Sequence, residues 1–300
     1  MAALVGAPSA VPAASAASPS AQCLVKNGTT RYTNLATAIS AAATNATLSI
    51  SGTCGGQFTI ARNLTLNGLG PVAILDPGGG GNGQGTGTVL TVEEARVVVK
   101  GLTITGGQRG VDNENGNLTL SLCTVTDNSG GGGGGGVYNH HGNLNLVGTN
   151  VFANESNGGG GGIFNYQGTV TLSGNSAVDG NEAPYGTGGG IDNDGGTVTL
   201  NDGSSVDGND AYFGGAFENF FGTLTLNGHS SIEGNSAEVG GGVRNVYATL
   251  ALNGQGVIAY NEPGSGIDDT CGTLIGVVVG VNVFDNSPYD TIEEGCGGGP

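Results

Sequence analysis

The sequence predicts an all-β fold, a single elongated parallel β-solenoid with three short strands in each coil. The first observation is a repeat: GTVTLSGNSAVDGNEAPYGTGGGIDN from Gly168 recurs in related form from Gly196 and again from Gly222. A period of this length is typical of solenoids, in which each unit packs only on its neighbours. The second observation is that apolar and polar residues alternate within short runs, as in strands with one buried face. The third is that asparagine returns at two fixed places in each unit.

Composition limits the functions that this chain can have. It has 300 residues, 63 of them glycine, with 10% charged residues and a formal net charge of −17. Such a charge disfavours nucleic acid and anionic membrane surfaces, both of which require Lys and Arg. It also disfavours a polyanionic glycan, unless Ca²⁺ bridges the carboxylates. No apolar run is long enough for a transmembrane helix, so we expect no membrane insertion.

The N-terminal residues indicate export. Residues 1–22 are rich in Ala, Ser and Pro and resemble the remnant of a secretory signal followed by a linker. Residues 14–16 (ASA) suit signal cleavage. We therefore expect a secreted or extracellular protein, with a low-complexity tail as the alternative.

The five cysteines agree with an oxidising compartment. Cys23 and Cys54 flank the N-terminal region, and a disulfide between them would staple it. Cys271 and Cys296 lie one repeat apart, which places them on adjacent coils at disulfide spacing. Cys123 is left over and is predicted to be a buried free thiol. No Cys or His spacing indicates a metal site.

A short helix is predicted at residues 33–43, where an apolar stripe repeats with helical spacing. The stripe consists of Leu35, Ala38, Ile39 and Ala42, and Thr33 or Asn34 can serve as N-cap. This helix would cover the open end of the solenoid core. The segments are a signal remnant and linker (1–22), an N-terminal cap (23–60), a β-helix (61–286) with regular coils from about 110, and a C-terminal tail (287–300). Early strands are predicted at 47–50, 58–60, 64–66, 73–75, 90–92, 97–99 and 102–104.

Two series of asparagines mark the turns of the regular coils. The first is Asn113, Asn139, Asn165, Asn193, Asn219 and Asn245, continued by Asp269; the second is Asn128, Asn154, Asn181, Asn209, Asn235, Asn261 and Asn286. We explain them by the tolerance of asparagine for left-handed backbone and by amide side chains that hydrogen-bond along the axis. Apolar residues near each series, such as Ile191 and Val178, are expected to face inward. The runs 130–136 and 158–162, which are almost pure glycine, are expected to be flexible insertions.

The repeats resemble a known class of proteins. GGGVYN (134–139), GGGIFN (160–165), GGGIDN (188–193) and GGGVRN (240–245), alternating with VDGN or IEGN, resemble right-handed parallel β-helix proteins of the pectin-lyase-like class. They also resemble the repeats of bacterial polymorphic outer-membrane adhesins. The resemblance covers roughly residues 23–290. It implies a right-handed β-helix, but such folds host lyases, hydrolases, adhesins and inert surface proteins.

One candidate site is a column of carboxylates, Asp179, Asp207 and Glu233, which the alternation turns outward on three successive coils. Enzymes of the resembled class place acidic residues on neighbouring coils for Ca²⁺ binding or for acid and base catalysis. We expect the loops 182–190, 210–214 and 236–241 to border this column. A solvated acidic face is the alternative. The sequence motifs typical of polygalacturonases, Asn-Thr-Asp, Gly-His-Gly and Arg-x-Lys, are absent as a set.

Arg244 is the basic residue of the regular coils that could assist such a site. It belongs to another column expected to face outward, consisting of Asp112, Tyr138, Phe164, Asp192, Glu218, Arg244 and Asp268. A surface ion pair between Arg244 and Glu218 is the simpler interpretation.

Two further arrays face outward. Tyr138, Phe164, Tyr166, Phe220, Phe221 and Tyr247 are predicted to cluster at the turn edge of the first asparagine series, where they could stack on sugar rings or only on each other. Threonine pairs at Thr169/Thr171, Thr197/Thr199 and Thr223/Thr225, followed by Thr249/Ala251, resemble ice-binding faces, although threonine favours any exposed strand.

We expect a non-catalytic, adhesin-like binding or structural protein whose partner is a polysaccharide or a cell-surface molecule. A polysaccharide lyase or glycoside hydrolase using Asp179, Asp207, Glu233 and Arg244 is the alternative, and an ice-binding protein is the second. No cofactor is expected. A bound structural Ca²⁺ ion is an alternative, because the DNDG segment at 192–195 resembles a Ca²⁺-binding loop, although it lacks the downstream Glu of such loops.

Overall fold

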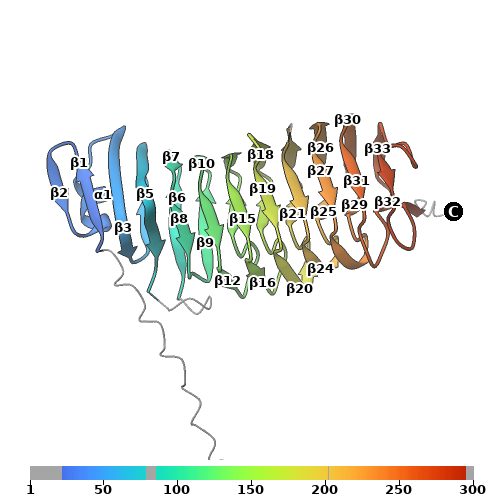
Figure 1. The fold of residues 1–300 in the computed structure, drawn as a ribbon, viewed down its shortest axis with the longest axis horizontal. Helices are drawn as coiled ribbons and strands as arrows, with labels where there is room; N and C mark the ends of the chain where they lie inside the picture. The colour runs from blue at the N-terminus through green and yellow to red at the C-terminus, as the bar shows by residue number, and fades with distance from the viewer. Residues whose placement is uncertain (1–21, 79–85, 202, 295–300) are drawn as a thin grey trace, which may run out of the picture.

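The computed structural model describes residues 22–78, 86–201 and 203–294, and it shows a parallel β-helix. The coils follow one another along the long axis of an extended rod, with β1 (Leu24–Asn27) and α1 (Leu35–Ala41) at one end (Figure 1). The predicted signal remnant and Cys296 lie outside the described residues. The predicted all-β solenoid fold is therefore confirmed.

The strands form three sheets. The ten-stranded sheet contains β4 (Phe58–Ile60), β6 (Thr88–Glu93), β9 (Arg109–Glu114), β13 (Val137–His140), β17 (Ile163–Tyr166), β21 (Ile191–Asp194), β25 (Phe217–Phe220), β29 (Val243–Val246), β32 (Ile267–Thr270) and β35 (Thr291–Glu294). The five-stranded sheet contains β12 (Ser129–Gly130), β16 (Glu155–Ser156), β20 (Glu182–Thr187), β24 (Asp210–Phe213) and β28 (Ser236–Val239). In Figure 1 most of these short strands run along the lower edge of the rod.

The twenty-stranded sheet is made of two runs of strands. The first run is β3 (Ala46–Gly55), β5 (Leu64–Asp76), β7 (Arg96–Lys100), β10 (Asn117–Ser121), β14 (Asn143–Val147), β18 (Thr169–Ser173), β22 (Thr197–Leu200), β26 (Thr223–Gly228), β30 (Thr249–Gly254) and β33 (Thr273–Ile275). The second run is β8 (Thr103–Thr105), β11 (Thr124–Thr126), β15 (Asn150–Phe152), β19 (Ala177–Asp179), β23 (Ser205–Asp207), β27 (Ser231–Glu233), β31 (Val257–Ala259) and β34 (Val283–Phe284). β1 and β2 (Thr30–Tyr32) complete the sheet at the N-terminal end.

One coil illustrates how the sheets connect. β17 lies in the ten-stranded sheet, β18 and β19 lie in the twenty-stranded sheet, and β20 lies in the five-stranded sheet. The first three are the strands that the sequence predicts for each coil. The fourth strand is a finding of the structure. It starts directly after the second asparagine of the coil, where the chain lengths between coils differ.

The core consists of the predicted apolar columns. Residues of the column that precedes the first asparagine series are fully buried and pair in register from coil to coil: Val111, Val137, Ile163, Ile191, Phe217, Val243 and Ile267. Because successive side chains of a strand point to opposite faces, the residues between them face outward. The core thus determines which side chains reach the surface.

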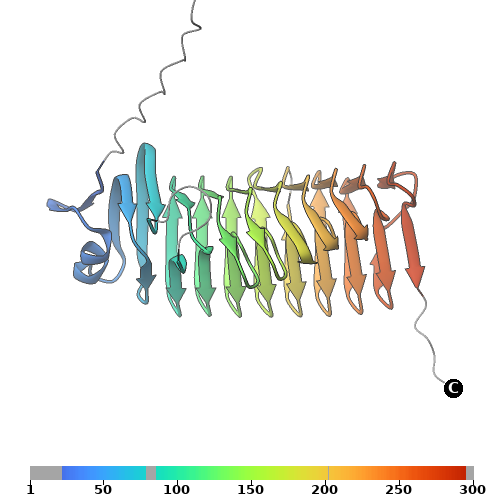
Figure 2. The same cartoon turned by 90° about the horizontal axis from the view of Figure 1, so that it is seen from below.

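The N-terminal end of the core is capped by α1. The helix spans Leu35–Ala41, shorter than the predicted 33–43, and Asn34 caps it by accepting a hydrogen bond from the Thr37 amide at 2.9 Å. Figure 2 shows α1 at the end of the stack. A disulfide joins Cys23 to Cys54 with their Cα atoms 4.6 Å apart, as predicted. Within the described ranges, no helix has the length and apolar character needed to cross a membrane.

Both asparagine series form ladders of buried amides. In the first, each side-chain amide donates to the amide oxygen one coil further, at 2.6–2.8 Å from Asn113 to Asn245, and Asn245 donates to Asp269 at 2.6 Å. In the second, the corresponding distances from Asn128 to Asn286 are 2.9–3.0 Å. The predicted ladders are confirmed.

Left-handed backbone lies beside these asparagines and not at them. Positive φ occurs two residues after the first series, at Asn115, His141, Gln167, Gly195, Phe221, Tyr247 and Cys271, and one residue before the second, at Asp127, Ala153, Gly180, Gly208, Gly234, Tyr260 and Asp285. Our conformational explanation of the ladder asparagines is therefore wrong. Their side chains satisfy buried backbone groups at the turns, which only a short amide can do on both sides.

The glycine runs are stacked backbone and not loose insertions. The Gly135 amide donates to the Gly160 carbonyl at 3.2 Å, and the Gly161 amide donates to the Gly188 carbonyl at 3.1 Å. A Cβ atom on Gly133 would collide with the Phe164 ring at 2.7 Å. Residues 133–136 and 158–162 are glycine because backbone here packs directly on neighbouring strands and side chains, whereas Gly131 and Gly132 have open space around them.

A hydroxyl ladder that the sequence analysis missed runs beside the core. The Cys123 amide donates to the Thr149 hydroxyl at 3.2 Å, and the Thr149 amide donates to the Ser176 hydroxyl at 3.1 Å. Cys123 is a buried free cysteine, as predicted. The other predicted bridge, Cys271–Cys296, stays a prediction because Cys296 lies outside the described residues.

Replacing one ladder asparagine should destabilise the chain strongly. The Asn181 amide donates to the Val151 carbonyl at 3.0 Å and to the Asn209 amide oxygen at 3.0 Å, and its own oxygen accepts from Asn154 at 3.0 Å. Asn181→Ala leaves several buried groups unpaired, so we expect a loss of about 3 kcal/mol. Urea unfolding measures it. The exposed Asn143→Ala is the control and should change stability by less than ~0.5 kcal/mol. Equal effects of the two substitutions would contradict this account.

Candidate functional site

The outer face of the ten-stranded sheet carries an acidic hollow with a volume of about 230 Å³. It is lined by Phe164, Thr187, Asp192, Asp194, Glu218 and Phe220. We call this group the acidic hollow. Its residues come from three adjacent strands of the sheet, β17, β21 and β25, and from the end of β20.

The sheet register places these side chains next to one another. Phe164 pairs with Asp192, and Asp192 pairs with Glu218, on three successive coils. Two residues further along the same strands, Asp194 pairs with Phe220. Ile191 and Asn193 point into the core, so Asp192 and Asp194 point out. The sequence alone determines this alternation.

Backbone segments that fold back over the ten-stranded sheet bury Asp192. The Thr187 hydroxyl, at the end of β20, lies 2.5 Å from an Asp192 carboxyl oxygen. Gly159 packs so closely on the same carboxyl group that a Cβ atom there would overlap it. Asp192 therefore lies beneath segments from two coils. Its column faces outward as predicted, but Asp192 is covered, because the sequence could not show where the variable segments return.

Glu218 is also buried, with 4% of its surface exposed. One of its carboxyl oxygens accepts a hydrogen bond from Arg244 at 2.7 Å. The other oxygen, Oε2, is buried without a hydrogen-bond partner. The Arg244 guanidinium also lies 4.8 Å from the centroid of the Phe213 ring. The predicted ion pair is present. Its Glu218 end is buried, whereas the Arg244 side chain packs on Phe213 of β24 and is 26% exposed.

Burial shifts the ionisation of both carboxyl groups. It raises the pKa of Asp192 to about 8, against the hydrogen bond from Thr187, which lowers it. Burial also raises the pKa of Glu218 to about 7, even though Arg244 favours the charged form. Two neighbouring carboxyl groups thus titrate near neutral pH, which is typical of functional sites.

A second arginine repeats the Arg244 arrangement toward the N-terminal end of the same face. Arg109 contacts Asp112 at 2.6 Å, lies 4.5 Å from the centroid of the Tyr138 ring, and donates to the Gly133 carbonyl at 2.9 Å. The sequence carries no signal for Arg109, Thr187 or Phe213, because these contacts depend on how segments fold over the sheet. We considered Asp194 only as part of the Ca²⁺-loop-like DNDG segment, although strand alternation also places it on this face.

The predicted aromatic residues divide into two groups. Tyr138 stacks on Phe164 with ring centroids 5.3 Å apart, and Tyr166 joins them together with His140 and His141. Phe221 lies between Phe220, at 4.4 Å, and Tyr247, at 5.4 Å. Asp194 separates the groups because it lies in register between Tyr166 and Phe220. The aromatic rings therefore flank the acidic hollow on both sides.

The predicted carboxylate column lies elsewhere. Asp179, Asp207 and Glu233 end β19, β23 and β27 of the twenty-stranded sheet, in register and half-buried. Arg244, on the ten-stranded sheet, pairs with Glu218, so the structure does not bring Arg244 to this column. The variable segments cross to the acidic hollow, where Thr187 and Phe213 contact Asp192 and Arg244.

Asp179 nevertheless has an unusual environment. Burial, followed by the nearby Asp207 charge, raises the pKa of Asp179 to about 6. Its Oδ1 atom is buried without a hydrogen-bond partner. Hollows of about 370 and 490 Å³ adjoin it, lined in part by Asn150, Phe152 and Leu122.

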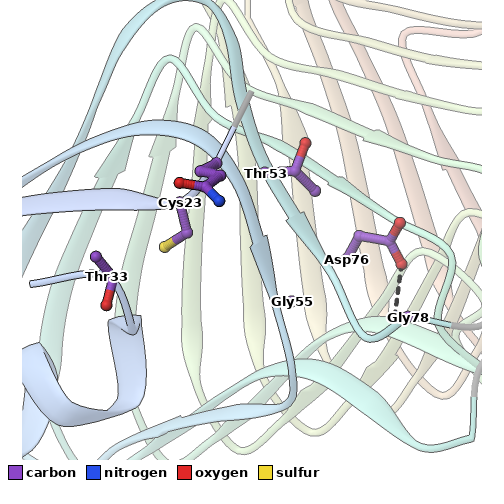
Figure 3. Close-up of a pocket in the computed structure, with 7 residues that line it drawn as sticks. Cys23, Thr33, Thr53, Gly55, Asp76 and Gly78 are labelled. Carbon is purple, nitrogen blue, oxygen red and sulfur yellow. Dashed lines mark hydrogen bonds between the residues drawn. The ribbon is translucent and has the colours of Figure 1, made fainter. Parts of the chain in front are cut away.

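Other candidate features lie away from both places. The threonine pairs stack in register on β18, β22, β26 and β30, so ice binding stays a prediction. A hollow of about 570 Å³ lies at the N-terminal end between Cys23, Thr33, Thr53 and Asp76 (Figure 3). Asp76 accepts a hydrogen bond there from the Gly78 amide at 2.8 Å. Within the described ranges, no group of three His, Cys, Asp or Glu side chains is placed to hold a metal ion.

Comparison with known proteins identifies the fold. The sequence matches no protein family and no curated protein. The crystal structure of an alginate lyase from Paenibacillus sp. str. FPU-7 matches with a TM-score of 0.52 at 14% identity, covering 87% of this chain and 95% of that one. This likeness confirms the resemblance to the pectin-lyase-like β-helix fold. At such identity it carries no information about activity.

Stability should decrease as pH rises toward 8, because of the buried carboxyl groups. In the unfolded chain their pKa values return to about 4, so the folded chain binds extra protons from about pH 4 to 8. Their contribution is complete below pH 4 and is lost as pH rises through 7 and 8. Between pH 5.5 and 8.5, we expect the Tm of the wild type to fall on the order of 5 °C more than that of Asp192→Asn.

The exposed Asp127→Asn is the control for this comparison, and its Tm profile should follow that of the wild type. Parallel profiles for the wild type and Asp192→Asn would show that Asp192 ionises normally.

Proposed function

We propose that this protein acts outside the cell and binds a glycan, without cleaving it, on the outer face of the ten-stranded sheet. The observation that carries this proposal is the acidic hollow, in which buried carboxyl groups lie between half-buried aromatic rings on one side and exposed aromatic rings on the other. The disulfide Cys23–Cys54 supports an oxidising environment. The polysaccharide-acting enzyme with the same fold supports a polysaccharide as partner.

The chemistry of the hollow suits a sugar. Aromatic rings stack on the apolar faces of sugar rings, while a few fixed polar groups orient the hydroxyl groups. Glu218 lines the hollow, but its Oε2 atom is itself buried. The half-buried Asp194, at the edge of the hollow, is therefore the carboxylate to which a ligand hydroxyl can donate.

Two of the rings occupy exposed turns. Phe221 and Tyr247 lie at the left-handed position that follows each asparagine of the first series, with φ values of 51° and 50°. Both rings are exposed, by 59% and 55%, so they add little to the core. Aromatic side chains held at these turns are consistent with a binding surface.

Removing a ring beside the hollow should weaken glycan binding. Phe220 and Phe152 are each 37% exposed, but Phe152 lies on the twenty-stranded sheet. We expect Phe220→Ala to reduce affinity for a bound oligosaccharide at least tenfold, by calorimetric titration. Phe152→Ala is the matched control and should bind as the wild type does. Loss of binding in Phe152→Ala alone would move the site to the Asp179 region.

Polysaccharide cleavage is the second candidate function. Glycoside hydrolysis needs one carboxylic acid to protonate the leaving oxygen and one carboxylate to act on the sugar. Asp192, with its pKa raised to about 8, is protonated at neutral pH, and Arg244 favours ionised Glu218. Strands in register lie about 4.8 Å apart, near the carboxyl separation of about 5 Å in retaining enzymes.

Turnover would be assayed by release of reducing ends, and by absorbance of unsaturated products, on neutral and uronic polysaccharides. If cleavage occurs, Asp192→Asn and Glu218→Gln should each lower kcat at least a hundredfold. Asp207→Asn, in the column selected from sequence, should retain activity. The opposite pattern would assign catalysis to the Asp179 column, and absence of turnover would leave binding as the function.

A further inference from the structure

The charges around the acidic hollow bear on which glycan it accepts. The charged side chains that line it are all acidic: Asp192, Asp194 and Glu218. A ligand that enters therefore meets carboxyl groups on two adjacent strands. Buried Asp192 and Glu218 can offer protons or lone pairs to hydroxyl groups, while Asp194 lies nearer the surface.

The nearest cationic side chain, Arg244, already has binding partners within the protein. Arg244 is held by Glu218 at 2.7 Å and stacks on the Phe213 ring at 4.8 Å. To pair with a ligand carboxylate, it would have to leave Glu218, whose second oxygen already lacks a partner. Breaking a buried ion pair in this way is costly.

No other Lys or Arg side chain is placed to replace it. The chain has seven Lys and Arg residues. Apart from Arg244 they are Lys26, Arg31, Arg62, Arg96, Lys100 and Arg109. Arg109 contacts Asp112, the Tyr138 ring and the Gly133 carbonyl. The rest precede the regular coils, several coils away from the hollow.

From this arrangement we infer that the hollow selects glycans without carboxylate groups, either neutral sugars or amino sugars, and rejects uronates. A uronate carboxylate would lie against Asp194 with no free cation to pair with it. Neutral hydroxyl groups can donate to the half-buried Asp194. A sugar ammonium gains further from Asp194 and from the faces of Phe164 and Phe220. The net charge of −17 acts in the same direction at long range.

This inference rests on the proposed glycan binding, and the test separates the two. Calorimetric titration at pH 7.5 and 0.15 M salt compares β-1,4-mannohexaose with β-1,4-hexamannuronate, and cellohexaose with its C6-oxidised counterpart. Each pair differs only at C6. A chitosan hexamer represents amino sugars. We expect a neutral or amino hexamer to bind at least tenfold more tightly than either uronate.

Reversing one charge at the hollow should increase affinity for a uronate. A misfolded variant would lose binding and could not produce this increase. Asp194→Lys should raise affinity for hexamannuronate at least tenfold and remove the preference for the neutral sugar. Asp207→Lys changes the net charge equally on another sheet, and it should leave the preference unchanged.

Three results would overturn these conclusions. Equal or tighter uronate binding by the wild type, weakened by Phe220→Ala, overturns the selectivity and leaves glycan binding in place. Equal gains in Asp194→Lys and Asp207→Lys would show that net charge, and not the hollow, discriminates. If no hexamer binds, both the selectivity and the proposed glycan binding are wrong.

Discussion

The buried amide ladders are the constraint on which the rest of this structure depends. From Asn113 to Asn245 and from Asn128 to Asn261, each turn asparagine is buried and bonds to the equivalent residue one coil further, so a slip of one coil relative to the next would leave amides and backbone carbonyls unpaired in the core. Register is therefore specified twice, by apolar columns inside and by amides at the turns. Outward side chains follow as straight columns, which is how Phe164, Asp192 and Glu218 become neighbours although they are 26 or 28 residues apart.

The repeat by itself would make a uniform rod, and the acidic hollow arises where uniformity is broken. Coils differ in the segment after the second asparagine, which forms the five-stranded sheet and then returns over the ten-stranded sheet. Glycine lets that backbone lie directly on side chains, as Gly159 does on Asp192. Carboxyl groups that an exposed strand would keep charged are thereby desolvated, and the pKa values of Asp192 and Glu218 rise to about 8 and 7.

Binding and cleavage place different demands on the same residues. Binding requires that Asp194 accept hydrogen bonds while the rings hold the sugar faces. Cleavage requires in addition that Asp192 and Glu218 differ in protonation at the working pH. Thr187 acts on the pKa of Asp192, and Arg244 acts on the pKa of Glu218. The rigid coils hold these groups in position, as both functions need.

The sequence alone determined the solenoid, its inward columns, both asparagine ladders, the capping helix and the Cys23–Cys54 disulfide, because each depends on periodicity or on short-range spacing. It also identified the aromatic residues and the Arg244–Glu218 pair. It could not rank Asp192 above Asp179, since alternation turns both outward and burial decides between them. Only the tertiary structure shows that Thr187, Gly159 and Phe213 return over one sheet, because the path of an irregular segment depends on packing against distant coils and not on its own sequence.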